Sequence, residues 1–294
     1  MKQVAFSKLV LVCYESILPQ IVFLFKFLSI DVRGLDLSSN LFSRWEAIGE
    51  ITRELPLLRR LSLKCVINFS HSVDAKLVSL CSRNRLQPLQ SFRPLEGVFE
   101  NLTDLQLNAT FLSWAEMQAI TSTMPNLQLI EMGYNCLSRL SDGVIPPHDC
   151  NIQVINLDTN NCSDWIHLCA SFSKYHSYVI ACQIVCSYPF HLSSLQRIIL
   201  TSNQIGTIPF PGRLEDPVLT IKYLSLSDNF LNAWSDIDAL SCWFPKLETL
   251  TMSGNPLTNG RPTSFICINL QYFLKIPNSE TTHVPSSSQE YHPS

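Results

Sequence analysis

The sequence predicts an α/β solenoid of about eight repeats, with a curved parallel sheet on its concave face and helices on its convex face. Two observations indicate this fold class. A strand-like L-x-L segment followed by a short turn recurs eight times, and in seven of them the turn residue is Asn. Successive turn residues are 25 or 26 positions apart in five of the seven intervals. Such a period is typical of architectures in which each unit buries its apolar face only against its neighbours.

The eight rows follow the pattern L-x-x-L-x-L-x-x-N-x-L, which is the leucine-rich-repeat signature. They are VRGLDLSSNLFSRW (32–45), LRRLSL…SRNRLQPL (58–89, interrupted), LTDLQLNATFLSW (102–114), LQLIEMGYNCLSRL (127–140), IQVINLDTNNCSDW (152–165), LQRIILTSNQIGTI (195–208), IKYLSLSDNFLNAW (221–234) and LETLTMSGNPLTNG (247–260). Their Asn side chains should bond backbone groups where the chain leaves each strand, forming a structural ladder of Asn40, Asn84, Asn135, Asn160, Asn203, Asn229 and Asn255. Thr110 takes the ladder position in the third row, so we expect a weaker ladder there.

The rest of each repeat is predicted to be helical. Three residues past the ladder position stand good N-cap residues, namely Ser43, Ser113, Ser138, Ser163, Asn232 and Thr258. Ser43 with Glu46 and Ser113 with Glu116 have the spacing of capping boxes. A Trp follows the cap in four repeats, and we expect these side chains to anchor the convex side of the core: Trp45, Trp114, Trp165 and Trp234. Pro56, Pro125 and Pro245 then end the helical segments.

Two of the seven intervals are longer, at 44 and 43 residues. Removing residues 64–81 from the second row leaves LRRLSLSRNRLQPL, a complete repeat, and the second excess falls near residues 174–187. Each segment is either a genuine loop insertion or a short intron read in frame. The first separates a strand from the turn that closes it, which favours the intron; the second fits either account. If it is translated, the first should be extruded as a loop that weakens the Asn84 turn.

The sequence divides into three parts. Residues 1–30 are an apolar segment without a repeat row, residues 31–260 are the repeat domain, and residues 261–294 are a partly disordered tail rich in Ser, Pro and Thr. The apolar stretch 17–30 contains Pro19 and Lys26 and falls short of the roughly 20 apolar residues of a spanning helix, so no membrane association is expected. Neither end offers the polar cap that a solenoid needs, so we expect the chain to be the middle of a longer protein.

Composition and motifs favour a binding protein over an enzyme. The net charge of −3 gives no case for nucleic acid as a partner, and the eleven cysteines are best interpreted as reduced thiols. The chain contains no nucleotide-binding, metalloprotease or serine-hydrolase motif, so no residue is nominated as catalytic and no cofactor is expected. Cys182, Cys186 and His176 match no standard zinc spacing, and no metal site is predicted.

Binding is therefore expected on the concave face. In each L-x-x-L-x-L row the residues flanking the middle apolar position point out of the sheet, because side chains alternate along a strand. A mixed polar surface with Arg and Tyr suits a protein partner. The predicted partner-binding residues are Arg60, Asp104, Gln106, Glu131, Asn156, Arg197 and Tyr223.

Several segments resemble the leucine-rich-repeat region of the tubulin-specific chaperone E family, also called tubulin-folding cofactor E. They are VRGLDLSSNLFSRWEAIGEITRELPLLRRLSL, LTDLQLNATFLSWAEM, SSLQRIILTSNQI, IKYLSLSDNFLNAWSDIDAL and LETLTMSGNPLT. The resemblance implies a cytoplasmic, cytoskeleton-associated chaperone without enzymatic activity. It would bind α-tubulin and cooperate with other tubulin-folding cofactors in assembling or dissociating the tubulin heterodimer during microtubule biogenesis. The CAP-Gly and ubiquitin-like sequences that the family carries are not found here.

An alternative is a secreted or surface repeat protein that recognises an extracellular ligand. Four Asn-x-Ser/Thr acceptor sequences allow it, at Asn68, Asn101, Asn108 and Asn161. Extracellular repeat arrays usually end in disulfide-bonded caps, and no cysteine cluster flanks residues 31–260.

Overall fold

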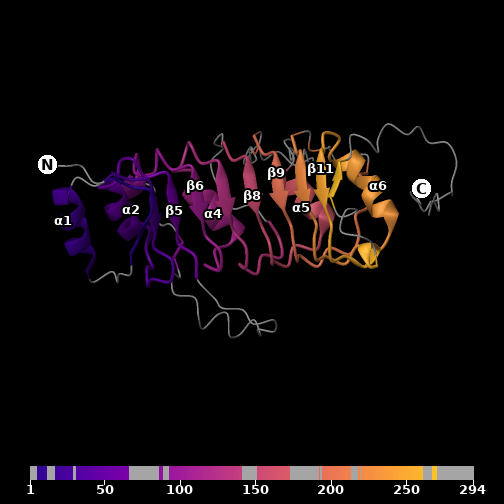
Figure 1. The fold of residues 1–294 in the computed structure, drawn as a ribbon, viewed down its shortest axis with the longest axis horizontal. Coiled ribbons are helices and arrows are strands. Elements are labelled where there is room, and N and C mark those ends of the chain that lie inside the picture. The colour runs from indigo at the N-terminus through magenta and orange to yellow at the C-terminus, as the bar shows by residue number, and fades with distance from the viewer. Residues whose placement is uncertain are drawn as a thin grey trace, which may run out of the picture.

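The computed structural model of the chain is an elongated, curved solenoid in which successive strands stand side by side along the long axis (Figure 1). The structure describes residues 5–11, 17–28, 31–65, 86–88, 93–140, 151–172, 192, 194–212, 218, 220–260 and 267–269. Its main sheet has ten strands, and their order in space follows the chain from β2 to β12 with β3 left out. All neighbours in it are parallel except β11 and β12, which pair antiparallel. The predicted fold class, an α/β repeat solenoid, is confirmed.

Eight of these strands correspond one to one with the eight rows of the sequence. They are β4 (Gly34–Asp36), β5 (Arg60–Ser62), β6 (Asp104–Gln106), β7 (Leu129–Glu131), β8 (Val154–Asn156), β9 (Arg197–Ile199), β10 (Tyr223–Ser225) and β11 (Thr249–Thr251). The remaining strands are β2 (Leu9–Val10) and β12 (Cys267–Asn269), with β1 (Ala5–Phe6) and β3 (Asp31–Val32) forming a separate two-stranded sheet.

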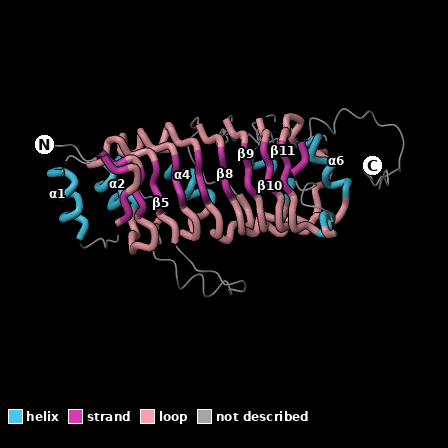
Figure 2. Tube along the Cα trace, viewed as in Figure 1, coloured by secondary structure: helices cyan, strands magenta, loops and turns pink. Residues whose placement is uncertain are grey.

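The helices lie together on one side of the sheet, behind the strands in Figure 2. They are α1 (Leu18–Leu28), α2 (Trp45–Arg53), α4 (Trp114–Thr121), α5 (Trp165–Phe172) and α6 (Trp234–Trp243). Two short 3-10 helices, η2 (Arg93–Leu95) and η3 (Pro256–Thr258), replace longer ones in their repeats. None of the described helices covers the opposite face of the sheet.

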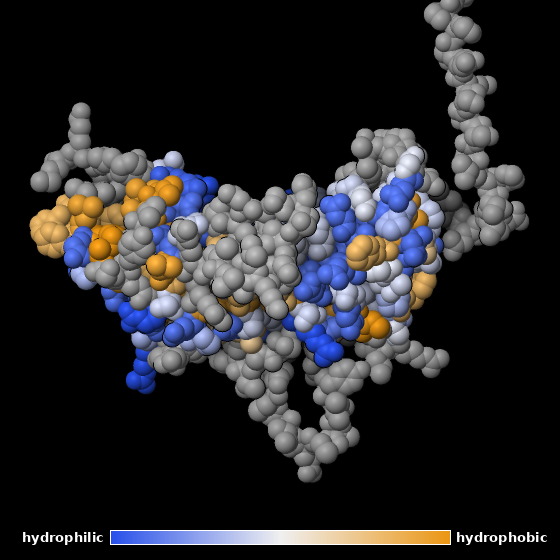
Figure 3. Space-filling view, turned by 90° about the horizontal axis from the view of Figure 1, so that it is seen from below, coloured by the Kyte–Doolittle hydropathy of each residue, from blue (hydrophilic) through white to orange (hydrophobic). Residues whose placement is uncertain are grey.

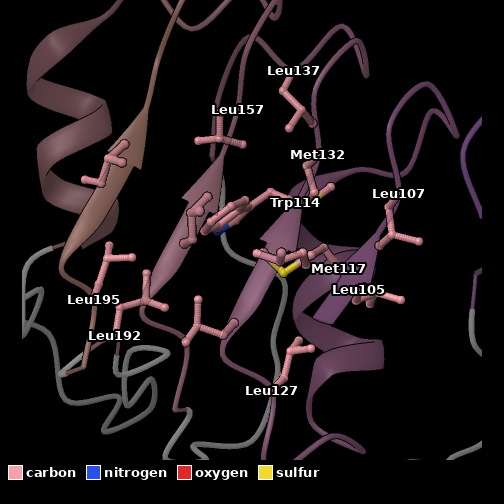
Figure 4. Close-up of a cluster of buried hydrophobic side chains, with 14 of the residues drawn as sticks. Leu105, Leu107, Trp114, Met117, Leu127, Met132, Leu137, Leu157, Leu192 and Leu195 are labelled. Carbon is pink, nitrogen blue, oxygen red and sulfur yellow. The ribbon is translucent and has the colours of Figure 1, made fainter. Parts of the chain in front are cut away.

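The core lies between the strands and the helices. The middle residue of each of the eight repeat strands, β4 to β11, points into it and is buried, as are the apolar residues on either side of the strand that share its inward direction. Figure 4 shows one stretch of this core, where Trp114 and Met117 of α4 lie among Leu105 of β6 and Leu107, Met132 and Leu157, which directly follow β6, β7 and β8. Because each layer packs only on the next, the core is continuous along the solenoid.

The structure corrects part of the capping prediction. Ser113 forms the expected capping box with Glu116 at α4. At α2 the N-cap is Arg44, which makes no side-chain cap bond, so the box predicted at Ser43 is wrong. At α6 the N-cap is Ala233 and not Asn232. At α5 the side chain of Asp164, not Ser163, accepts the amide of His167 at 3.0 Å.

The tryptophan prediction holds for three of the four residues. Trp45, Trp114 and Trp165 are each 2 % exposed and anchor the convex side of the core. Trp234, at the start of α6, is 43 % exposed, and Trp243 at the end of the same helix is buried in its place. In the final described helix the apolar anchor is thus supplied from the opposite end of the helix.

Residues 1–30, predicted to lie outside the repeats, contribute a strand and a helix to the solenoid. Leu9 pairs with Leu35, and the amide of Leu11 donates to the carbonyl of Asp36 at 2.9 Å, as in the internal repeats. α1 packs beside α2 and buries Phe25. Its outer face carries Phe23, Leu24 and Phe27, each more than half exposed, and gives the apolar end seen in Figure 3. Among the described residues, no helix has the length and apolar character needed to cross a membrane.

The first predicted insertion begins within a regular part of its repeat. The amide of Leu63 donates to the carbonyl of Gln106 at 2.9 Å, and the amide of Cys65 donates to that of Asn108 at 3.0 Å. Lys64 and Cys65 therefore occupy ordinary repeat positions, two residues into the segment 64–81. The rest of that segment, Asn84, the segment 174–187 and all of the tail 261–294 except β12 lie outside the described residues.

Candidate functional site

Three parallel rows of side chains cross the uncovered face of the sheet. Strand pairing in strict register makes the first residues of the strands one row: Gly34, Arg60, Asp104, Leu129, Val154, Arg197, Tyr223 and Thr249. The last residues of the strands form the second row: Asp36, Ser62, Gln106, Glu131, Asn156, Ile199, Ser225 and Thr251. All seven predicted partner-binding residues lie in these two rows.

A third row was not predicted from the sequence. It lies two residues beyond the second row, where the backbones of neighbouring repeats are still hydrogen-bonded, for example Ser39 to Lys64 and Cys65 to Asn108. Its members are Ser38, Lys64, Asn108, Gly133, Asp158, Thr201, Ser227 and Ser253. The alternation of the strand continues for these two residues, which is the signal that could have identified this row.

Glu131 is the centre of a hydrogen-bonded network on the N-terminal half of this face. Its carboxylate accepts bonds from Lys64 at 2.9 Å, Asn108 at 2.8 Å and Gln106 at 3.0 Å. The side-chain oxygen of Asn108 in turn accepts the amide of Gly133 at 2.8 Å. The network joins three repeats, β5 to β7, and satisfies the charge of Glu131 within the chain.

Asp158 lies beside this network with one oxygen buried. A Cβ added at Gly133 would overlap the Oδ1 of Asp158, so the carboxyl group fills the space that the missing side chain leaves. Among the described residues Oδ1 has no hydrogen-bond partner. Burial, and then the negative charge of Glu131, raise the pKa of Asp158 above its ordinary value.

The other charges of the N-terminal half are also engaged within the chain. Lys8 binds Asp36 at 2.8 Å, and although burial raises the pKa of Asp36, hydrogen bonds from Lys8 and Ser38 outweigh it and lower that pKa. The carboxylate of Asp104 accepts the hydroxyl of Thr103 at 2.5 Å. Arg60 is exposed and reaches the carbonyl of Ser7 at 3.5 Å.

The C-terminal half of the face, on β9 to β11, is rich in hydroxyl groups. Ser225 is hydrogen-bonded to Thr201 at 3.0 Å and to Thr251 at 2.9 Å, and Ser253 bonds Ser227 at 3.0 Å. Arg197 and Tyr223 stand side by side in the first row, both exposed, with the guanidinium carbon 5.7 Å from the centre of the tyrosine ring. At this distance the pair forms a cation–π contact.

The Asn ladder runs along one end of the strands and fixes the shape of this face. The amide of Asn229 donates to the carbonyls of Leu200 and Leu226, and its oxygen accepts the backbone amides of Asn203 and Ile205, all between 2.9 and 3.0 Å. Asn135, Asn160, Asn203 and Asn255 also bond two neighbouring repeats, and Asn40 bonds the carbonyl of Leu11. The Thr110 hydroxyl donates to the carbonyl of Leu107 at 2.8 Å and to the side-chain oxygen of Asn135 at 3.3 Å, and it lacks the NH2 group of the other ladder residues.

The ladder carries a feature that the sequence did not reveal. The residue before each described ladder position has a positive φ, whatever its type: Ser39, Ala109, Tyr134, Thr159, Ser202, Asp228 and Gly254. This left-handed residue turns the backbone sharply at the end of the strand and brings each Asn side chain back over the repeat before it.

The described residues include potential metal-ligating side chains and thiols. No group of three or more potential metal-ligating side chains is found among them. Cys65, Cys162 and Cys169 are buried and Cys136 and Cys242 are exposed, and burial raises the pKa of Cys162 to about 12. Cys182, Cys186 and His176 lie outside the described residues. The three rows of the concave face are the candidate site.

No protein-family model matches the chain. Curated relatives do match it, over about three quarters of its length. It is 25 % identical over 238 residues to tubulin-folding cofactor E of Arabidopsis thaliana and 27 % identical over 236 residues to tubulin-specific chaperone E of Bos taurus. It is 25 % identical over 228 residues to the tubulin-specific chaperone cofactor E-like protein of Homo sapiens. The resemblance to tubulin-folding cofactor E is confirmed.

The match to the plant and bovine proteins covers 78 % of this chain but only 37 % of each relative. The match to the human cofactor E-like protein covers 77 % of this chain and 45 % of that relative. The chain thus spans less than half the length of these relatives. The extent of the match is close to that of the repeat domain seen in the structure.

Proposed function

We propose that this chain is a tubulin-folding chaperone that binds α-tubulin through its concave face. It would act in assembly and disassembly of the tubulin heterodimer, and so in microtubule biogenesis, together with other tubulin-folding cofactors. The observation that carries the proposal is the uncovered face of eight strands in register, in a chain similar to proteins named tubulin-folding cofactor E. A rigid, polar and gently curved surface can hold a folded subunit by many contacts.

The chain would work without catalysis, cofactor or metal, in the cytoplasm and on the cytoskeleton. A chaperone of this kind needs only binding energy, since stabilising one conformation of its client shifts the assembly equilibrium. The concave rows supply hydrogen-bonding groups and a few apolar positions for that purpose. Nothing in the three rows resembles a nucleophile activated by a neighbouring base.

The secreted alternative is disfavoured by the surroundings of one acceptor sequence. Both polar atoms of the Asn108 amide are engaged, the nitrogen with Glu131 and the oxygen with the amide of Gly133. A glycan on that nitrogen would project from the middle of the network that joins β5 to β7 and would displace the bond to Glu131. A glycan at Asn108 would therefore block the concave face as a recognition surface.

The test is direct binding to tubulin. The purified full chain is immobilised, and αβ-tubulin is passed over it, with an unrelated leucine-rich-repeat protein as the matched surface. We expect saturable binding to tubulin only on the first surface, and crosslinks from Lys64 to α-tubulin peptides. Absence of binding, or crosslinks confined to β-tubulin, would overturn the proposal.

A further inference from the structure

The two halves of the concave face differ in how their charges are neutralised. On the N-terminal half, Glu131 and Asp36 each have a lysine partner within the chain. On the C-terminal half, the nine described positions of the three rows on β9 to β11 include a single charged side chain, that of Arg197. Among the described residues it forms no ion pair, and the polar side chains at the other eight positions all carry neutral hydroxyl groups.

Tyr223 holds the guanidinium in place without neutralising it. The contact of 5.7 Å is made by the face of the ring, whereas the N–H donors of a guanidinium lie in its own plane. The contact over the ring therefore restricts the arginine side chain without using its N–H donors. Ordering the side chain before binding lowers the entropy lost when a partner docks.

The neighbours of the pair are suited to a protein surface. Val154 lies beside Arg197 on β8, in the same row, and Ile199 lies in the second row of β9, both partly exposed. The hydroxyls of Thr201, Ser225 and Thr251 bond one another and leave a neutral polar border. A cation with apolar neighbours and a polar border has the composition of an interface anchor, in which Arg and Tyr are enriched.

We propose that Arg197, stacked on Tyr223, is the main docking anchor of the concave face and receives an aspartate or glutamate side chain of a folded partner protein. The carboxylate would accept two hydrogen bonds from the guanidinium edge, the geometry in which this pair is strongest. A folded partner fits better than a flexible acidic segment, because Val154 and Ile199 offer apolar contact that such a segment would not use. The inference rests on the proposed function, in that tubulin is the partner tested.

The experiment measures the affinity of the full chain for αβ-tubulin by biolayer interferometry. Arg197→Gln removes the charge, and Arg139→Gln makes the same change in an exposed loop away from the three rows. We expect Arg197→Gln to raise the Kd at least about tenfold and to flatten its dependence on salt, and Arg139→Gln to leave both unchanged. Far-UV circular dichroism and thermal unfolding verify that both variants are folded.

Two further variants distinguish the contribution of the planar guanidinium over the Tyr223 ring from that of the positive charge alone. Arg197→Lys keeps the charge but not the planar fork, and Tyr223→Leu removes the ring; each should raise the Kd several-fold. Wild-type affinity that is unchanged in Arg197→Gln overturns the inference and leaves the proposed function standing. Full affinity in Arg197→Lys would show that the charge alone is sufficient and that the planar guanidinium is not needed. A wild-type chain that does not bind tubulin overturns both proposals.

Discussion

The side-chain oxygen of Asn160 accepts the backbone amide of Asn135 at 3.0 Å, and so links the turn of one repeat to the turn before it. The same oxygen accepts the amide of Leu137 at 3.0 Å. Its amide nitrogen donates to the carbonyls of Met132 at 3.0 Å and Leu157 at 2.9 Å. One buried side chain therefore satisfies four backbone groups in two repeats, none of which has access to water in its place.

Replacing Asn160 by alanine should destabilise the solenoid more than a single lost hydrogen bond would. Each buried backbone group left without a partner costs about 1–3 kcal/mol, and partial relaxation reduces the sum, so we expect a loss of roughly 2–5 kcal/mol. Chemical denaturation of the full chain measures it. Asn160→Asp keeps the size and the acceptor oxygen but replaces the NH2 donor with a second oxygen that faces the carbonyls of Met132 and Leu157, and it should also be destabilising. A loss below about 1 kcal/mol for alanine would contradict the ladder as a source of stability.

The third row of the sequence provides the opposite test. Thr110 is buried, and its one hydroxyl donor is shared between the carbonyl of Leu107 and the side-chain oxygen of Asn135. The asparagine at the next ladder position donates to the carbonyls of two repeats. Thr110→Asn should add a second donor toward the carbonyl of Leu63, the residue aligned with Leu107, and stabilise the chain by about 1 kcal/mol. Thr110→Val, which has the same shape and no hydroxyl, is the matched control and should be destabilising. A loss of stability in both variants would show that the site has no room for the asparagine.

Much of this fold could be predicted from the sequence because the apolar positions and the ladder Asn are direct chemical requirements of a stacked repeat. The core needs Leu35, Leu61 and their equivalents, and the turn needs an amide that both donates and accepts. Helix starts are less constrained, since any short acceptor near the turn can cap, and Asp164 does so where Ser163 was expected. The strand at Leu9 was missed because Tyr14 stands 26 residues before Asn40, where the pattern requires Asn.

The left-handed residue before each ladder position leads to another prediction. Thr159 has a φ of 51° and is exposed, and a β-branched residue is strained in this region. Thr159→Gly should relieve that strain, but it also makes the unfolded chain more flexible. We expect the free energy of unfolding to rise by about 0.5–1 kcal/mol on balance. Thr249→Gly, in the extended strand β11, should instead be destabilising. Thermal unfolding of the two variants compares them; a loss of stability in Thr159→Gly would contradict the assignment of strain.

Asp158 should give the chain a recognisable pH dependence. Its folded pKa is raised above the ordinary value of 3.8, first by burial and then by Glu131. As pH rises through the interval between the unfolded and folded pKa values, the unfolded state releases the proton first, and stability falls. Asp158→Asn removes this loss of stability. The difference in the free energy of unfolding between the variant and the wild type should therefore be absent at pH 3 and should grow in favour of the variant as pH rises through that interval.

A second variant isolates the contribution of the neighbouring charge. Glu131→Gln removes the negative charge but not the burial, so the pKa of Asp158 should fall and remain above its ordinary value. Titration followed by nuclear magnetic resonance of the Asp158 carboxyl carbon measures both values. An Asp158 pKa that is the same in wild type and Glu131→Gln would remove Glu131 as a cause.

The residues of the candidate surface could be identified from the sequence, but they could not be ranked by their availability to a partner. Strand alternation alone placed Arg60, Glu131 and Arg197 on the outward face, because the period of two is a property of the backbone. Which of them is available to a partner depends on contacts between repeats: Lys64, from a row that was not predicted, neutralises Glu131. No pattern within one repeat contains that information, since the two residues are brought together only by stacking.

Two buried tryptophans should respond differently to the same substitution. The indole nitrogen of Trp243 donates to the carbonyl of Pro209 at 2.6 Å, whereas that of Trp114 has no partner among the described residues. Replacement by phenylalanine removes similar apolar volume at both sites, but only Trp243→Phe also breaks a hydrogen bond and leaves the Pro209 carbonyl without its donor. We therefore expect Trp243→Phe to cost about 1–2 kcal/mol more than Trp114→Phe, in urea denaturation of the full chain. Equal losses of stability would mean that both residues stabilise the chain by packing alone. A larger loss at Trp114 would indicate that its indole N–H donates a hydrogen bond.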